Sequence, residues 1–456
     1  MRRSPSGPVH GDRQRGVARL RGVAVGCLGL LAALGGVGCE RVILDFGDAA
    51  SDGTTPDGSS GDDGPPPPAP EAPELIVSDV FNPYEQSSGS RSCEDGGDIV
   101  SYRVVALAGN QVELDVAPGA GCLSAGDELL LIKLQGHEGN QINVGRFELA
   151  RMLDGDARQV QLVSPALGSY GEAEGTNDGL TLGGTWLVRV PNYSRVVVEP
   201  GASLQGRAWS GDGAGVLVMR ALGDWIVDGL VSMNEAGFRG GPSVVEALGD
   251  GVAGESALGP LTVGRPPNGG GGGGGSGDRT TSGCVQDGNA GGGGGHVAAG
   301  EDARVLDHCD GEGRGLGGLA YASAGRLFLG AGGGSGGVDN VRVDNPPSGA
   351  GGAGGGLVFL LGQSLSGVGS IEARGAAGVG DEPGFECETG YETTRCYDHS
   401  GPGGGGAGGT IRLAVAQLGD VALRVDGGPG GNGFDGSTGD GGAGADGVIQ
   451  GASEAP

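Results

Sequence analysis

Short runs of alternating apolar and polar residues occupy the chain from Leu75 to about Glu199. They lie at 99–105, 112–116, 129–134, 159–163, 186–190 and 195–198. Turn residues separate them at the spacing of about 8–12 residues that is typical of sandwiches and barrels. No amphipathic helical pattern of ten or more residues occurs anywhere in the sequence. The pattern therefore predicts a small all-β domain, a sandwich or a barrel, over residues 75–199.

A different pattern begins at about residue 200. Glycines lead into an apolar strand, a short turn follows, and a second alternating strand precedes the next glycines. The strand pairs begin at Val216 and Val231, at Leu357 and Ile371, and at Ile411 and Leu423. A repeat of short strands with one inward face is typical of a solenoid or of stacked sheets. We expect a glycine-rich β-repeat domain over residues 200–450, with Leu327–Leu329 as a fragment of a further unit.

Long glycine tracts separate these strand pairs. Glycine supplies 108 of the 456 residues, whereas ordinary usage is about 7%. The tracts are flexible linkers or ordered extended helices with three residues per turn, which pack closely only when they consist of glycine. We favour packed polyglycine tracts, because they pair backbone N–H and C=O groups. In addition, so many glycines without such restraint would give the unfolded chain a very high conformational entropy. The strict Gly-X-Y period of collagen is absent.

The first 38 residues resemble an export signal. Six arginines precede an apolar stretch at 22–38, which is too short and too glycine-rich for a membrane span. Val37-Gly38-Cys39 resembles the lipobox of bacterial lipoproteins, although Gly36 replaces the usual leucine, and the resemblance implies lipidation of Cys39. The alternative is a plain secretory signal with an incidental cysteine. Residues 39–74 are expected to be a lipid anchor and a disordered, acidic, proline-rich tether, and residues 451–456 a disordered tail.

The charge of the chain narrows its partners. The formal net charge is -28, and it becomes -33 once the six arginines and single aspartate of residues 1–38 are removed. Such a chain lacks the basic face that nucleic-acid binding requires and does not adhere electrostatically to anionic lipid. The expected partners are the membrane, through the lipid, and a polysaccharide or another surface protein.

Six cysteines remain after Cys27 and Cys39 are set aside. They follow one another as Cys93 and Cys122, Cys284 and Cys309, and Cys387 and Cys396. An even number of cysteines in an exported chain indicates disulfides. Many pairings are open, and we favour the sequential one, because each pair brackets an otherwise unrestrained segment.

No metal site and no catalytic constellation is expected. His296, His308, His399 and the nearby cysteines have zinc-ligand chemistry but no zinc-site spacing. Asp435, Asp440 and Asp446 do not meet the repeat of calcium-binding β-rolls. The sequence contains no G-x-S-x-G, H-E-x-x-H or phosphate-loop motif in the required context. We therefore expect no cofactor and no catalysis.

Three tryptophans are the candidate ligand-binding residues. Trp186, Trp209 and Trp225 could form a platform on which sugar rings stack, or they could fill a core. The leading hypothesis is an exported lipoprotein of the outer membrane or cell surface with a structural or adhesive role. The alternative is a carbohydrate-binding surface module, and an enzyme ranks third.

The chain from about residue 125 to residue 447 carries a family resemblance. Residues 125–132, 188–193, 201–204, Trp209 and 236–241 are similar to exported glycine-rich, PGRS-like proteins of high-GC gliding bacteria. The resemblance covers roughly 125–447 and implies a surface location more than an activity. The glycine tracts alone are loosely similar to the glycine-rich domain of the anaplastic lymphoma kinase receptor, which contains packed polyglycine helices.

Overall fold

A computed structural model describes residues 72–451, with gaps at 90, 138–139, 212, 247–248, 278–288, 305–312, 323–324, 339–346, 381–387, 390–393, 396–399 and 434–438. The regular elements in this part of the chain are 23 β-strands, so the predicted all-β class is confirmed. The same residues include no helix long and apolar enough to cross a membrane.

Six of the strands close into an antiparallel barrel. In barrel order they are β3 (Ser101–Ala108), β4 (Gln111–Leu114), β7 (Gln159–Leu162), β6 (Phe147–Asp156), β5 (Glu128–Gln135) and β8 (Gly184–Val190). Alternating side chains of β4 and β7 point inward, as the period of two requires. The barrel interior includes Val104, Val112, Leu129 and Leu131, all fully buried.

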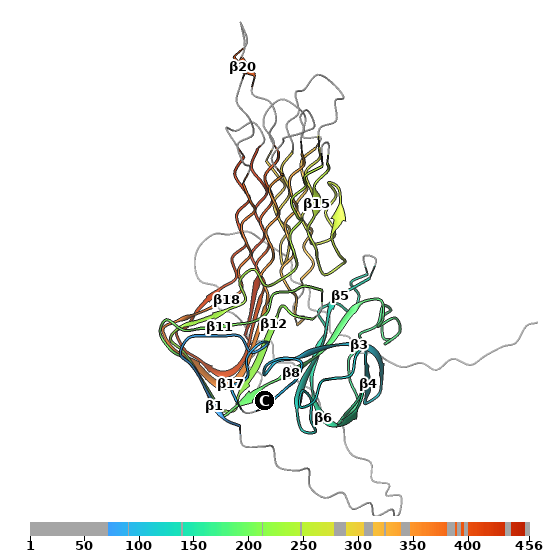
Figure 1. Ribbon diagram of the computed structural model, residues 1–456, viewed down its shortest axis with the longest axis vertical. Helices are drawn as coiled ribbons and strands as arrows, with labels where there is room; N and C mark the ends of the chain where they lie inside the picture. Colours follow the sequence, from blue (N-terminus) through green and yellow to red (C-terminus); the bar gives the residue numbers. More distant parts are fainter. Residues whose placement is uncertain are drawn as a thin grey trace, which may run out of the picture. The chain divides into compact units, whose positions relative to one another are not determined.

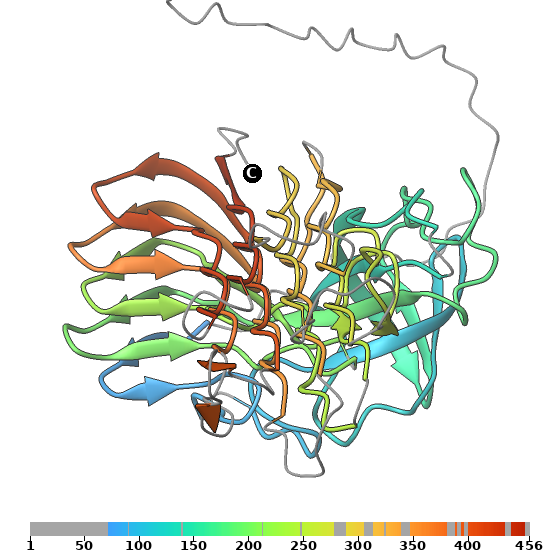
Figure 2. The ribbon, with the colours of Figure 1, turned by 90° about the horizontal axis from the view of Figure 1, so that it is seen from above.

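A parallel β-solenoid accounts for most other strands (Figures 1 and 2). Its larger sheet has eight strands. They are β1 (Glu74–Val77), β9 (Asn192–Tyr193), β10 (Arg195–Val198), β12 (Val216–Ala221), β13 (Asp224–Val227), β17 (Leu357–Ser366), β21 (Thr410–Leu418) and β23 (Val448–Gly451). The long β17 pairs with β12 through its first half and with β13 through its second half.

The second solenoid sheet has five strands. In sheet order they are β2 (Val80–Phe81), β11 (Ser203–Gln205), β14 (Leu230–Ser232), β18 (Ser370–Glu372) and β22 (Ala422–Arg424). Equivalent inward positions stack from coil to coil, at Phe81, Leu204, Val231, Ile371 and Leu423. The three predicted strand pairs are thus successive coils of a solenoid.

The barrel covers fewer residues than the domain predicted at 75–199, since its strands run from Ser101 to Val190. Strands β1 and β2 precede the barrel in sequence, and β9 and β10 follow it, yet all four belong to the solenoid sheets. Glu74–Val77 pairs in register with Arg195–Val198, although the whole barrel lies between them in the sequence. Short strands carry too few residues for their periodicity to reveal the sheet they join.

The barrel and the solenoid share a core. Strand β5 is buried on both faces, since Leu129 and Leu131 point into the barrel while Leu130 and Ile132 pack with the solenoid residues. Arg220 of β12 donates to both carboxylate oxygens of Glu128 in β5, at 2.6 and 2.7 Å. Such bidentate, charge-assisted bonds fix orientation as well as distance.

The remaining short strands form two antiparallel pairs. One joins β15 (Val252–Ala253) to β16 (Thr262–Val263), and the other joins β19 (Glu388–Thr389) to β20 (Thr394–Arg395). The expected strand fragment at Leu327–Leu329 is wrong, because these residues are extended and fully or nearly fully buried but join no sheet.

Candidate functional site: the polyglycine bundle

Extended glycine-rich runs leave the solenoid and hydrogen-bond to one another. They depart between β14 and β17, between β18 and β21, and between β22 and β23. In Figure 1 they lie side by side in the upper half of the view. The runs include 251–255, 269–277, 289–296, 313–320, 327–338, 348–356, 373–380, 400–409, 425–433 and 439–447. Their packing confirms the predicted ordered polyglycine tracts, and we call this assembly the polyglycine bundle.

The run at 291–295 shows how the bundle is built. Successive N–H groups donate to three different neighbours, and residues three apart donate to the same one. Gly291 and Gly294 donate to Pro402 and Gly405, Gly292 and Gly295 to Gly273 and Gly270, and Gly293 to Glu301, at 2.7–2.9 Å. Its carbonyls accept from Gly334, Gly318 and Gly442 of three further runs. Three residues per turn is the period of a polyproline II helix.

The close approach of the runs leaves no room for a side chain. A Cβ added at Gly293 would lie 1.9 Å from the carbonyl oxygen of Ala443, and one at Gly404 would lie 2.0 Å from that of Gly292. Similar distances recur through the interior of the bundle. Because the obstructing atoms are backbone, they cannot rotate away, and the tract is therefore pure glycine.

Outer runs carry side chains at every third residue. Asp426, Pro429 and Asn432 are exposed while the glycines between them face neighbouring runs. Arg374 and Ala377 are exposed with the same spacing on the adjacent run. Arg374 forms an ion pair with Asp426 at 3.4 Å, across two runs. The exposed side chains of the bundle therefore form rows whose spacing the backbone fixes.

A buried histidine lies at the base of the bundle. His296 follows the glycine tract directly, is fully buried, and packs edge-on against Tyr321, with ring centroids 5.6 Å apart. Tyr321 in turn packs against Phe328 at 5.5 Å. The Nε2 atom of His296 lies 3.4 Å from Oγ1 of Thr410, the first residue of β21. Desolvation lowers the pKa of His296 from 6.5 to about 4, so the ring is neutral and structural.

The described parts of several runs end next to one another, at the end of the bundle away from His296. The N–H of Gly337 donates to the carbonyl of Asn289, and the N–H of Asn289 donates to the carbonyl of Ser276. The N–H of Gly401 donates to the carbonyl of Gly337, and all three distances are 2.8–3.1 Å. Arg304 donates to Asp440 at 2.9 Å. These residues flank segments 278–288, 305–312, 339–346, 381–399 and 434–438, which lie outside the described residues apart from β19 and β20. We call this the open end of the bundle.

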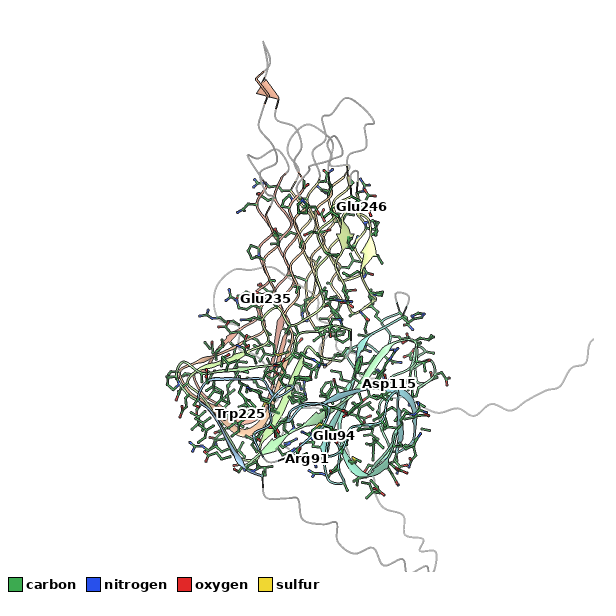
Figure 3. All side chains as sticks on the ribbon, in the orientation of Figure 1. Arg91, Glu94, Asp115, Trp225, Glu235 and Glu246 are labelled. Carbon is green, nitrogen blue, oxygen red and sulfur yellow. A yellow bond between two sulfur atoms is a disulfide. The ribbon has the colours of Figure 1, made fainter. Side chains whose placement is uncertain are left out.

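The three predicted ligand-binding tryptophans do not form a surface platform. Trp186, Trp209 and Trp225 are 6%, 4% and 0% exposed. Trp225 lies inside the solenoid (Figure 3) and donates its indole N–H to the carbonyl of Leu361 at 2.9 Å. Trp186 and Trp209 stack edge-on, with ring centroids 6.4 Å apart. Buried indoles offer no face to a sugar, so of the two roles that the sequence left open these tryptophans have the core role.

The cysteines divide between the described residues and the rest. Cys93 and Cys122 form a disulfide, as the sequential pairing predicts. The buried Arg189 of β8 donates to the carbonyls of Cys122, Asp98 and Gly97 at 2.6–3.0 Å, which ties the bridged segments to the barrel. Desolvation lowers the pKa of Arg189. Cys39, Cys284, Cys309, Cys387 and Cys396 lie outside the described residues.

The described residues contain no group of three or more His, Cys, Asp or Glu side chains positioned to hold a metal ion. His308, His399 and Asp435 lie outside them.

The barrel surface carries a groove of about 650 Å³. Its lining includes Glu148, Leu149 and Arg151 of β6 and the segment Val163–Leu167. Glu148 accepts hydrogen bonds from the backbone N–H groups of Leu167 and Gly168, at 2.9 and 3.4 Å. Glu128, also in the lining, is occupied by Arg220. The groove combines apolar walls with polar groups, as small-molecule sites do.

No protein-family model matches the chain, and no curated protein matches it. Among solved structures, the tailspike gp61 of Pseudomonas phage phi297 is 13% identical over 36% of this chain and 29% of its own, with a TM-score of 0.17. The Gp54 tailspike of Acinetobacter baumannii bacteriophage AP22, solved with A. baumannii capsular saccharide, is 9% identical over 36% of this chain and 31% of its own, with a TM-score of 0.16. The chain spans less than a third of either tailspike.

Proposed function

We propose that this chain is an exported, lipid-anchored surface protein with a structural or adhesive role and no catalytic activity. The observation that carries the proposal is the open end of the polyglycine bundle. Inside the bundle, backbone hydrogen bonds and packing exclude side chains. Several runs leave the bundle at one end, and the segments between them contain four cysteines and the aromatic residues Phe385, Tyr391, Tyr397 and Phe434. The closely packed, hydrogen-bonded runs would hold both ends of each of these segments in fixed positions.

The adhesive role is tested by exchanging segments at the open end. Residues 381–399 and 434–438, which contain these four aromatic residues and two of the cysteines, are replaced by glycine–serine segments of equal length in the full chain. A matched control replaces the exposed barrel residues Val116 and Leu153, which lie outside the groove, by serine. We expect attachment of producing cells to matrix polysaccharide to fall only with the segment exchange. Equal attachment by wild type and exchanged chain, both present at the surface, would contradict an adhesive role.

The lipid anchor is tested separately. Cys39→Ala removes the sulfur that the lipobox resemblance assigns to lipidation, whereas Cys27→Ala leaves it. We expect palmitate labelling and membrane retention to be lost in the first variant and kept in the second. Labelling that survives Cys39→Ala would overturn the anchor without affecting the adhesive proposal.

The barrel groove supports a second candidate, the binding of a small saccharide. It is the observation that favours this role once the tryptophans are placed in the core. Arg151→Ala removes a guanidinium at the groove. Arg158→Ala serves as the control, because Arg158 lies in the turn between β6 and β7 and outside the groove lining. A polysaccharide pull-down in which only the first variant loses saturable binding would favour the groove. Unchanged binding in both variants, or loss in both, would exclude it.

A further inference from the structure

A buried polar cluster at one end of the barrel is not explained by the proposed function. Lys133 of β5 is 1% exposed, Asn143 is fully buried, and the Glu172 side chain is 15% exposed. Nζ of Lys133 donates to Oε1 of Glu172 at 2.6 Å and to the carbonyl of Gly171 at 2.9 Å. A lysine buried in this way is costly unless it is paired, and its occurrence calls for a reason.

The amide of Asn143 and the amine of Lys133 share one hydrogen-bond acceptor. Nδ2 of Asn143 donates to the same Gly171 carbonyl at 2.8 Å, so both nitrogens lie within hydrogen-bond distance of one oxygen. Oδ1 of Asn143 is buried and accepts no hydrogen bond from the described residues. A buried acceptor without a donor is unfavourable, and in this place it is available to a proton donor during a reaction.

The third member, Glu172, is closely positioned. It lies next to Gly171 in sequence, and its Oε2 accepts from Nδ2 of Asn140 at 3.1 Å. A Cβ added at Gly183 would lie 2.2 Å from its Oε1, so Gly183 provides the space for the carboxylate. Burial lowers the pKa of Lys133 more than the contact with Glu172 raises it, and a lowered pKa favours the neutral, nucleophilic amine.

We propose that Lys133 and Asn143 form an intramolecular isopeptide bond, with Glu172 as the proton-transfer residue. Glu172 takes a proton from the Lys133 ammonium, and the neutral Nζ attacks Cγ of Asn143. The Nζ–Cγ bond forms and the Cγ–Nδ2 bond breaks. Nζ gives its second proton to the departing NH2 group, which leaves as ammonia, while the first proton stays on Glu172. The reaction needs no oxidant and no co-reactant. The bond would join β5 covalently to the turn that precedes β6.

A second asparagine near Glu172, Asn140, can be compared with Asn143 as the side-chain amide that Lys133 attacks. Asn140 also contacts Glu172, but its amide is partly exposed and donates to the main-chain carbonyl and Oε2 of that residue rather than to the oxygen that Lys133 uses. Asn143, with its unpaired Oδ1, is therefore the assigned acceptor. Substituting each asparagine in turn shows which of the two forms the bond.

Intact mass spectrometry of the purified, reduced full chain tests the proposal. We expect wild type to be lighter than its calculated mass by one ammonia, and digestion to release a branched peptide that links Lys133 to Asn143. Glu172→Gln, Lys133→Arg and Asn143→Ala should each restore the calculated mass, whereas Asn140→Ala should not. Asn143→Asp should give the linked mass by losing water instead.

Three results would overturn the assignment. One is a folded wild-type protein at its full calculated mass. Another is a loss of ammonia that survives Asn143→Ala. The third is a loss of ammonia without a branched peptide, since cyclisation of an asparagine to a succinimide also releases ammonia. Circular dichroism of each variant shows that it is folded, and Lys133→Arg and Glu172→Gln keep the polar character of the site.

Discussion

The barrel and the polyglycine bundle are ordered by opposite means. The barrel is filled by side chains such as Val104, Leu129 and Leu131, which are fully buried in its interior. The bundle is held by backbone hydrogen bonds between glycine runs, and its interior excludes side chains. In the barrel, apolar volume removed from water stabilises the fold. In the bundle, the absence of side chains lets the backbones approach closely enough for N–H and C=O groups to form hydrogen bonds.

This difference predicts different tolerance to substitution. A side-chain core accepts changes that conserve volume and loses stability when volume is removed. A polyglycine interior accepts no addition at all, because the atoms around each Cα belong to neighbouring backbones. On the outer runs, every third position faces solvent and is free to vary.

The largest effect is expected at Gly293. In Gly293→Ala, the Cβ would lie 1.9 Å from the carbonyl oxygen of Ala443, so the runs must separate and several buried hydrogen bonds weaken together. We expect a loss of more than about 4 kcal/mol of stability, since each buried polar group left unpaired costs about 1–3 kcal/mol. Hydrogen exchange of the bundle amides and urea denaturation measure it.

Gly259 provides the control. Its nearest neighbour to an added Cβ is Oδ1 of Asn268, at 3.9 Å, which is an ordinary contact. Gly259→Ala should change stability by less than about 1 kcal/mol. Equal effects of the two substitutions would show that the bundle interior is not closely packed.

The barrel core should respond next. Leu131→Ala empties a fully buried site and should cost about 3 kcal/mol, within the usual range for such truncations. Leu131→Met conserves volume and should cost less than about 1.5 kcal/mol. Denaturant unfolding gives both values. A methionine variant as unstable as the alanine variant would remove the proposed contrast with the bundle.

Acid should weaken the base of the bundle through His296. Its pKa is about 4 in the folded chain against 6.5 ordinarily, so the unfolded chain binds the proton first as the pH falls. The stability that the neutral His296 provides is fully present above about pH 6.5 and is lost progressively as the pH falls to about 4. The total loss of unfolding free energy is about 3 kcal/mol. His296→Gln removes the titration. Urea midpoints at pH 7.5 and 4.5 should therefore differ less in the variant, and an identical pH dependence would contradict this assignment.

The smallest effect is expected on the outer surface of the bundle. Arg374 and Asp426 form an ion pair whose side chains are 46% and 61% exposed. Solvent screens such pairs, and their contribution is about 0–1 kcal/mol. Arg374→Ala should leave the thermal midpoint nearly unchanged. A large loss would mean that side chains, as well as backbone, hold the runs together.

Much of the architecture follows from local sequence patterns. The solenoid coils can be predicted because strands begin directly after glycines at Val216, Leu357 and Thr410, and a second short strand follows each at a similar offset. The barrel strands are readable from their alternation. The first coil is not, because β1 and β2 have only four and two residues and their partners are distant in sequence.

The candidate sites were less accessible to prediction. Trp186, Trp209 and Trp225 have the composition of a sugar platform, but burial is a property of the assembled sheets. The Lys133 cluster forms no sequence motif, because its members come from β5, the turn before β6 and the loop before β8. One signal was present, since Lys133 interrupts the apolar run Leu129–Leu134.

By itself, the sequence determined the all-β class, the solenoid repeat and the places where only glycine is found, because strand periodicity and the absence of a Cβ are local properties. Tertiary structure decided which runs become neighbours. A run such as 291–295 donates hydrogen bonds to three other runs and accepts them from three more, and nothing in five consecutive glycines specifies those partners. Their arrangement is set by the solenoid and by side chains at the base of the bundle, which anchor the ends of the runs.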